Sequence, residues 1–171
     1  MAAFDEILQL LGPPRFNWSD DSCWRQLEEE IGVRFPEDFR RFSDSYGPIK
    51  INNQLGVGHP GTERGNLGYD IRTTVGAWQG APDGEVPYPV GAAPGELLPW
   101  ASAASGETVF FRVPERDGER WSVGVYESDE GEYYEYLMSF DEWMLAYLEG
   151  QDVTVCSRNF APDGPFYEPV R

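Results

Sequence analysis

The sequence is poor in the residues that build most small catalytic centres. It contains one histidine, His59, which excludes metal sites made from several imidazoles. Its one lysine, Lys50, lies outside any glycine-rich loop, which excludes a phosphate-binding P-loop. The two cysteines, Cys23 and Cys156, are far apart and lack C-x-x-C spacing, so we expect a reducing, cytoplasmic location and no disulfide framework. We expect neither a metal ion nor a cofactor.

Long apolar runs are also missing. Proline, glycine or a charged residue interrupts each stretch before it reaches the roughly 18 residues that a membrane span requires. The first twenty residues carry Asp5 and Glu6 where a signal peptide needs positive charge. We therefore expect a soluble protein that is not exported by the usual route.

Positive charge is scarce throughout the chain. Thirteen Lys and Arg residues against thirty Asp and Glu residues give a formal net charge of -17. A charge of this sign repels phosphate backbones and anionic lipids, so we expect neither nucleic acid nor a membrane as a partner. The deficit is uneven, because the net charge is -6 up to residue 85 and -11 beyond it.

No lysine or arginine occurs between Arg120 and Arg158. A surface of one sign can simply keep a protein in solution, or it can attract a partner with a basic surface. We interpret this window as a partner-binding surface. Its predicted contact residues are Glu127, Asp129, Glu130, Glu132, Glu135, Asp141, Glu142 and Glu149.

The pattern of apolar residues predicts one α+β domain over residues 1–171. Helical spacing extends from Trp24 to Ile31, where Gly32 is a stop signal, and from Phe39 to Tyr46, and residues 4–11 form a shorter candidate helix. The period then becomes two, which predicts an antiparallel meander of about four to six strands. A capping box at Ser139–Glu142 opens a C-terminal helix that packs, like the N-terminal helices, on the sheet. The four clearest strands are expected over 97–101, 108–113, 121–126 and 133–138.

The middle and the end of the chain are less regular. Residues 54–95 are rich in glycine and proline and are predicted to form an irregular insertion, which is a candidate binding loop. Short strands are expected over 49–51 and 69–75. Residues 151–171 form a C-terminal extension with a candidate strand over 153–156.

Two patterns could indicate cofactor binding or catalysis, but their surroundings in the sequence argue against both. Gly56–Gly61 reads G-x-G-x-x-G, but dinucleotide binding needs a buried strand before this motif and a helix opening within it. A nucleophile and base pair would have to use His59, which we expect on a surface turn. Several aromatic residues could stack bases or sugars, but their strand pattern favours the core. They are Trp78, Tyr88, Trp100, Trp121 and Tyr133.

The N-terminal half resembles the opening signature of the SUKH superfamily, the Smi/Knr-like family. The resemblance covers residues 19–150, and only the segment 54–95 has no counterpart. Departures are small: Phe35 stands where leucine is usual, Pro48 where a second glycine is frequent, and Glu107 where aspartate is usual. The matching residues are Trp24–Glu28, Ile31-Gly32, Phe35–Phe39, Phe42, Tyr46-Gly47, Leu97–Ala101, Gly106–Thr108, Val109–Val113, Phe140, Trp143 and Leu148.

The resemblance implies an α+β fold and a binding role without catalytic residues. In bacteria it implies an immunity protein that neutralises a cognate toxin of a polymorphic toxin system, often a nuclease or a deaminase. In eukaryotes it implies regulators, including cell-wall-assembly regulators. We expect an acidic, non-enzymatic binding protein whose partner is a cognate toxin or another protein with a basic surface. The alternatives are a regulatory or scaffold module and a small enzyme that uses His59.

Overall fold

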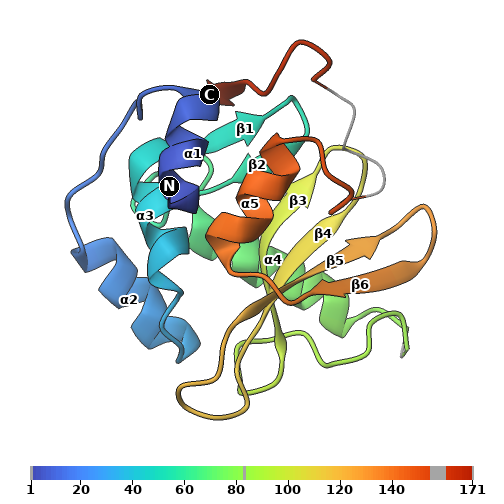
Figure 1. Ribbon diagram of the computed structural model, residues 1–171. Coiled ribbons are helices and arrows are strands. Elements are labelled where there is room, and N and C mark those ends of the chain that lie inside the picture. Colours follow the sequence, from blue (N-terminus) through green and yellow to red (C-terminus); the bar gives the residue numbers. More distant parts are fainter. Residues whose placement is uncertain (1, 83, 155–160, 171) are drawn as a thin grey trace.

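A single antiparallel sheet forms the centre of the protein (Figure 1). The computed structural model describes residues 2–82, 84–154 and 161–170. In these residues the strand order is β6-β5-β4-β3-β2-β1-β7, so six strands follow one another as a meander and β7 joins the outer side of β1. The strands are β1 (Ile49–Ile51), β2 (Leu55–Val57), β3 (Leu97–Ala103), β4 (Thr108–Arg112), β5 (Ser122–Glu127), β6 (Glu132–Tyr136) and β7 (Tyr167–Pro169).

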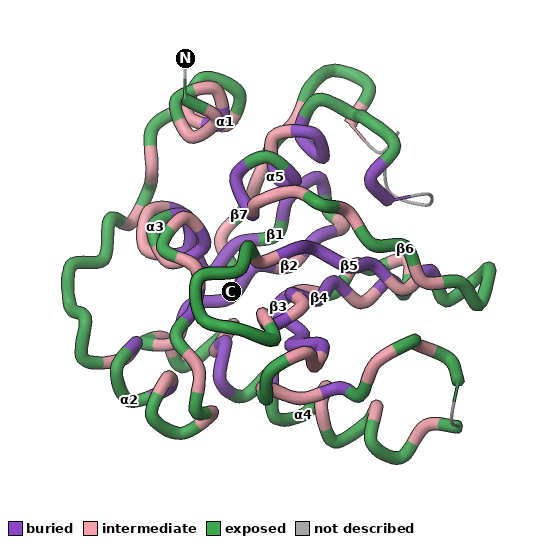
Figure 2. Tube along the Cα trace, turned by 60° about the horizontal axis from the view of Figure 1, so that its bottom comes forward, coloured by how far each residue is buried: buried purple, intermediate pink, exposed green. Residues whose placement is uncertain are grey.

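Helices cover both faces of this sheet. Figure 2 shows α1, α3 and α5 on one side of the strands and α4 on the other, with the buried residues concentrated in the strands between them. The bounds are α1 (Ala3–Leu11), α2 (Ser22–Ile31), α3 (Glu37–Tyr46), α4 (Leu67–Gln79) and α5 (Phe140–Leu148). The α+β prediction is confirmed, and the described sheet has seven strands because β2 and β7 add to the expected set.

Local sequence explains where the helices begin and end. Asp20 accepts a hydrogen bond from the Ser22 backbone N–H at 2.9 Å, and Gly32 ends α2 in the left-handed conformation with φ 81. Ser139 caps α5 as predicted, because its hydroxyl oxygen accepts from the Glu142 N–H at 3.3 Å, while the Glu142 carboxylate pairs with Arg120. Both helices therefore have the limits that their capping residues predict, to within a residue or two.

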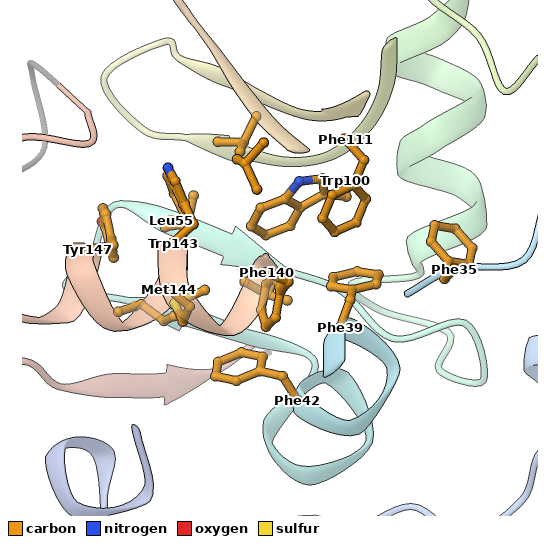
Figure 3. Close-up of a cluster of buried hydrophobic side chains, with 14 of the residues drawn as sticks. Phe35, Phe39, Phe42, Leu55, Trp100, Phe111, Phe140, Trp143, Met144 and Tyr147 are labelled. Atoms are coloured by element: carbon orange, nitrogen blue, oxygen red, sulfur yellow. The ribbon is translucent and has the colours of Figure 1, made fainter. Parts of the chain in front are cut away.

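Phe39 lies at the centre of an aromatic core between α3, α5 and the sheet (Figure 3). Its ring centroid is 5.4 Å from that of Trp100, 5.2 Å from Phe111 and 5.3 Å from Phe140. Trp100 in turn meets Trp143 at 5.6 Å with perpendicular planes. Edge-to-face contacts of this kind add to the gain from burying the rings, so this cluster joins the N-terminal helix pair to the sheet and to α5.

A smaller apolar cluster lies on the opposite face of the sheet. Phe110 is fully buried there, and Trp78 of α4 meets it edge-on at 5.7 Å. Tyr133 of β6 lies across Gly124 of β5, so that a methyl group at position 124 would collide with the tyrosine ring. Trp100 is buried in the main core, as predicted. The other four residues of that prediction are half-buried: Trp78, Tyr88 and Tyr133 pack against this second cluster and Trp121 packs against the main core.

The segment 54–95 is more regular than its composition predicts. The expected strand over 69–75 is wrong, because these residues lie in α4. Thr73, Thr74 and Val75 favour strands on their own, but the Asn66 side chain caps a helix by accepting from the Tyr69 N–H at 2.9 Å. The strand over 49–51 is confirmed as β1. The candidate strand over 153–156 lies partly outside the described residues.

Candidate partner-binding surface

Strand β6 forms one edge of the sheet. Its residues pair with β5 on one side only, in the register Val125 with Tyr134 and Glu127 with Glu132. In an antiparallel edge strand, alternate residues turn their backbone N–H and C=O groups away from the neighbouring strand. In the described part of the chain no other strand pairs with β6 on that side.

Apolar side chains are exposed along this edge and just beyond it. Leu137 is 81% exposed, the highest value among the large hydrophobic residues, and Tyr134 is 38% exposed. The Tyr134 hydroxyl donates a hydrogen bond to Glu130 at 2.8 Å, and this acceptor raises the pKa of the tyrosine. We call Glu130, Glu132, Tyr134 and Leu137 the β6 edge surface.

The eight predicted contact residues do not all lie on the surface. Six are exposed, namely Asp129, Glu130, Glu132, Glu135, Glu142 and Glu149. Glu127 is 0% exposed and Asp141 is 8% exposed, so both are corrected to interior positions that a partner does not reach in this conformation. Their burial depends on how the strands and helices pack, and the charge of a residue does not predict it.

Asp141 joins the start of α5 to α3. Its carboxylate accepts from the Arg41 guanidinium at 2.6 Å, and its backbone N–H donates to the Asp38 carboxylate at 3.0 Å. Burial and the nearby charge of Asp38 raise the pKa of Asp141 to about 6, although Arg41 acts in the opposite direction. This group therefore belongs to the packing of two helices.

Arginines outside the lysine- and arginine-free segment between Arg120 and Arg158 pair with some of its carboxylates. Arg120 forms an ion pair with Glu142. Glu135 accepts from the Ser122 hydroxyl at 2.9 Å and lies 4.0 Å from the Arg112 guanidinium. In the described part of the chain neither Glu130 nor Glu132, at the tip end of the β5–β6 hairpin, forms an ion pair with an arginine.

His59 lies in the interior and not on a surface turn, which corrects the prediction. It is 1% exposed, and burial lowers the pKa of its imidazole. Its Nδ1 accepts from the Gly61 N–H at 3.0 Å, so its Nε2 carries the proton and donates to Asp44 at 2.8 Å. Trp24 donates to the same Asp44 oxygen at 2.8 Å. Both ring nitrogens are therefore occupied, and neither is available to activate a nucleophile.

No local pattern in the sequence predicts this network, because its members are separated in the chain. Asp44 and His59 are 15 residues apart, and Trp24 and Asp44 are 20 apart. Trp18 stacks on the imidazole with ring centroids 5.3 Å apart. A helical pattern places Trp24 on an inner face, but only the fold shows that a buried histidine meets it.

Within residues 2–82, 84–154 and 161–170, no three His, Cys, Asp or Glu side chains gather as a metal site would require. Over the same residues no helix combines the length and the apolar character needed to cross a bilayer.

The fold is α+β with one antiparallel sheet, and a comparison with known families finds a match. A family model described as SMI1-KNR4 cell-wall, within the SUKH group, matches residues 21–144. The chain belongs to this family, whose members are generally non-catalytic immunity proteins or cell-wall regulators. No curated protein and no solved structure matches the chain significantly.

Proposed function

We propose that this protein is a non-catalytic immunity protein of the bacterial cytoplasm that binds and neutralises a cognate toxin through the β6 edge surface. One observation carries the proposal: Glu130 and Glu132 lie at one end of the edge strand β6 without an arginine partner among the described residues, and the exposed Leu137 follows its other end. Nuclease and deaminase toxins act on polyanionic substrates, so their clefts present basic residues. An acidic edge complements such a cleft.

The two parts of the surface act on different steps of binding. Glu130 and Glu132 accelerate encounter with a basic partner, and this effect weakens as salt is added. Leu137 and Tyr134 supply apolar contact area, which slows dissociation and depends little on salt. A strand of the partner that paired along β6 would also form hydrogen bonds with the backbone N–H and C=O groups that β6 turns away from β5.

A pull-down of the tagged protein from its host lysate at two salt concentrations tests this function. Recovery of a basic nuclease-like or deaminase-like domain, released as salt rises, supports the proposal. The double variant Glu130→Lys and Glu132→Lys should then weaken the complex and reduce its salt dependence. Glu29→Lys with Glu63→Lys is a matched control, because both residues are exposed and the net charge changes equally. Equal weakening by both pairs would contradict a role for this surface.

The alternative is a regulatory or scaffold module that acts in cell-wall assembly. The description of the matching family model, which reads SMI1-KNR4 cell-wall, favours it. Recovery of envelope-assembly proteins alone, without a toxin domain, would support this alternative over the immunity function.

A further inference from the structure

The two edges of the sheet differ in how they are protected against pairing with another strand. β7 has three residues, and one of them is Pro169, which has no backbone N–H. β6 has five residues, Glu132–Tyr136, and contains neither proline nor lysine. Its register with β5 continues without a bulge over all five. Proline, lysine and bulges commonly block an edge, so β6 relies on the negative charge of its glutamates.

The outer backbone groups of β6 have few partners in the chain. Among the backbone hydrogen bonds that the described residues form outside the strand ladders, β6 takes part in one, in which the Tyr136 carbonyl accepts from the Met138 N–H at 2.8 Å. Residues 132–135 take part in none of these bonds. Figure 1 shows β6 as the outermost strand on this side of the sheet. One more strand would therefore extend the antiparallel ladder.

Two apolar rows of the sheet end at β6. Val125 of β5 pairs with Tyr134, and Val123 pairs with Tyr136. Both valines are fully buried in the main core, whereas Tyr134 is 38% exposed and Tyr136 is half-buried. Side chains directly opposite each other on neighbouring strands are in contact. An added strand with apolar side chains at two alternate positions would therefore cover both tyrosines.

Glu132 decides which charge the added strand carries. It lies two residues before Tyr134 on the same face of the sheet, is exposed, and pairs with no arginine of the described residues. Glu130 beside the strand is also negative, and Glu135 faces the other side of the sheet, where it has the arginine described above. A second copy of the chain would bring more glutamates to this edge, and like charges on paired strands are unfavourable. A basic side chain opposite Glu132 is favourable for the same reason.

We propose that the β6 edge surface binds its partner by strand addition, in which an extended segment of a basic protein pairs antiparallel with β6. Two apolar residues of the segment lie beside Tyr136 and Tyr134, and a basic residue lies beside Glu132. Because antiparallel pairing reverses the order, the segment reads apolar-x-apolar-x-basic from its N-terminus. The inference rests on the proposed function of the β6 edge surface, and it adds the chemistry of the segment which that surface takes.

Nuclear magnetic resonance titration of the full-length protein with a capped peptide, acetyl-Val-Thr-Val-Thr-Arg-amide, tests the backbone part of the proposal. We expect it to shift the amide signals of residues 132–136 and to slow the hydrogen exchange of alternate amides among them. Two analogues are N-methylated, one at both valines and the other at both threonines. Alternate N–H groups of a strand point to opposite sides, so one analogue should lose affinity at least about tenfold and the other should bind like the parent peptide.

A charge exchange tests the role of Glu132. The peptide with glutamate in place of its arginine should bind about threefold more weakly or worse, because like charges then face each other. Glu132→Lys should reverse this preference between the two peptides. Glu29→Lys is the matched control, because it changes the net charge equally at an exposed position of α2 and should leave the preference as it is.

Three results would overturn strand addition: no binding of the parent peptide, equal binding of both N-methylated analogues, or an unchanged charge preference in Glu132→Lys. In each case the lysate pull-down with the Glu130→Lys, Glu132→Lys variant still decides the proposed function on its own. Conversely, peptide binding as expected together with recovery of envelope-assembly proteins alone would reject the toxin partner and leave strand addition in place. The failures of the two proposals are therefore distinguishable.

Discussion

Asp44 of α3 and His59 of the loop after β2 form a buried hydrogen bond of 2.8 Å between Oδ1 and Nε2. The same oxygen accepts from Trp24 of α2, so one carboxylate joins three segments that are distant in sequence. Because the other ring nitrogen also has a partner, the imidazole is held in one neutral form. The network fixes the loop that leads into α4.

The burial of His59 predicts that stability falls in weak acid. Burial lowers the pKa of the folded protein's imidazole below its ordinary value of 6.5. The unfolded chain therefore takes up a proton that the folded one does not, and stability is lost as pH falls below 6.5. Urea unfolding at pH 7.5 and 5.5 should show this loss. His59→Gln should lower stability at pH 7.5 by about 1 to 3 kcal/mol and reduce the pH dependence. An unchanged dependence in the variant would contradict the assignment.

Asp141 should act on stability in the opposite direction. The pKa of its carboxyl rises to about 6 in the folded state, from an ordinary value of 3.8. The folded protein then holds a proton more tightly than the unfolded chain, so this contribution is lost as pH rises from 3.8 to 6. Asp141→Asn should gain about 2 to 3 kcal/mol relative to the natural chain between pH 4 and pH 7. Chemical unfolding of the natural chain and of Asp141→Asn at pH 4 and at pH 7 measures this gain. Asp163→Asn, at an exposed carboxylate, is the control.

Phe39 should be among the most sensitive core positions. It is fully buried and contacts the rings of Trp100, Phe111 and Phe140 from different elements. Phe39→Ala should lower the free energy of unfolding by about 3 to 5 kcal/mol, because a cavity replaces the ring. Thermal unfolding with Phe166→Ala as a partly exposed control provides the comparison. Similar losses in both variants would contradict a central role for Phe39.

Gly124 should not accept a side chain while Tyr133 lies across it. An added methyl group would collide with the tyrosine ring, so Gly124→Ala should destabilise the β5–β6 hairpin. The collision disappears in the double variant with Tyr133→Ala, so the two effects should not add. A double-mutant cycle by urea unfolding measures the coupling. Simple additivity would show that the two residues do not touch.

The sequence by itself determined the elements whose signals are local. Helical spacing and capping residues located α2, α3 and α5, and the alternation of apolar residues located β3 to β6. These signals depend on the conformation of neighbouring residues, which a single stretch of chain contains. The family could be recognised for the same reason, because its motifs lie within these elements.

The tertiary structure alone decided which charged groups are buried and which residues meet. Asp38 and Asp141 are in contact although they are 103 residues apart. Glu127 of β5 and Glu132 of β6 have the same charge and are register partners, yet only Glu132, on the edge strand, is exposed. Burial depends on which faces pack together, and that packing is a property of the whole chain. The interior position of His59 follows from the same cause.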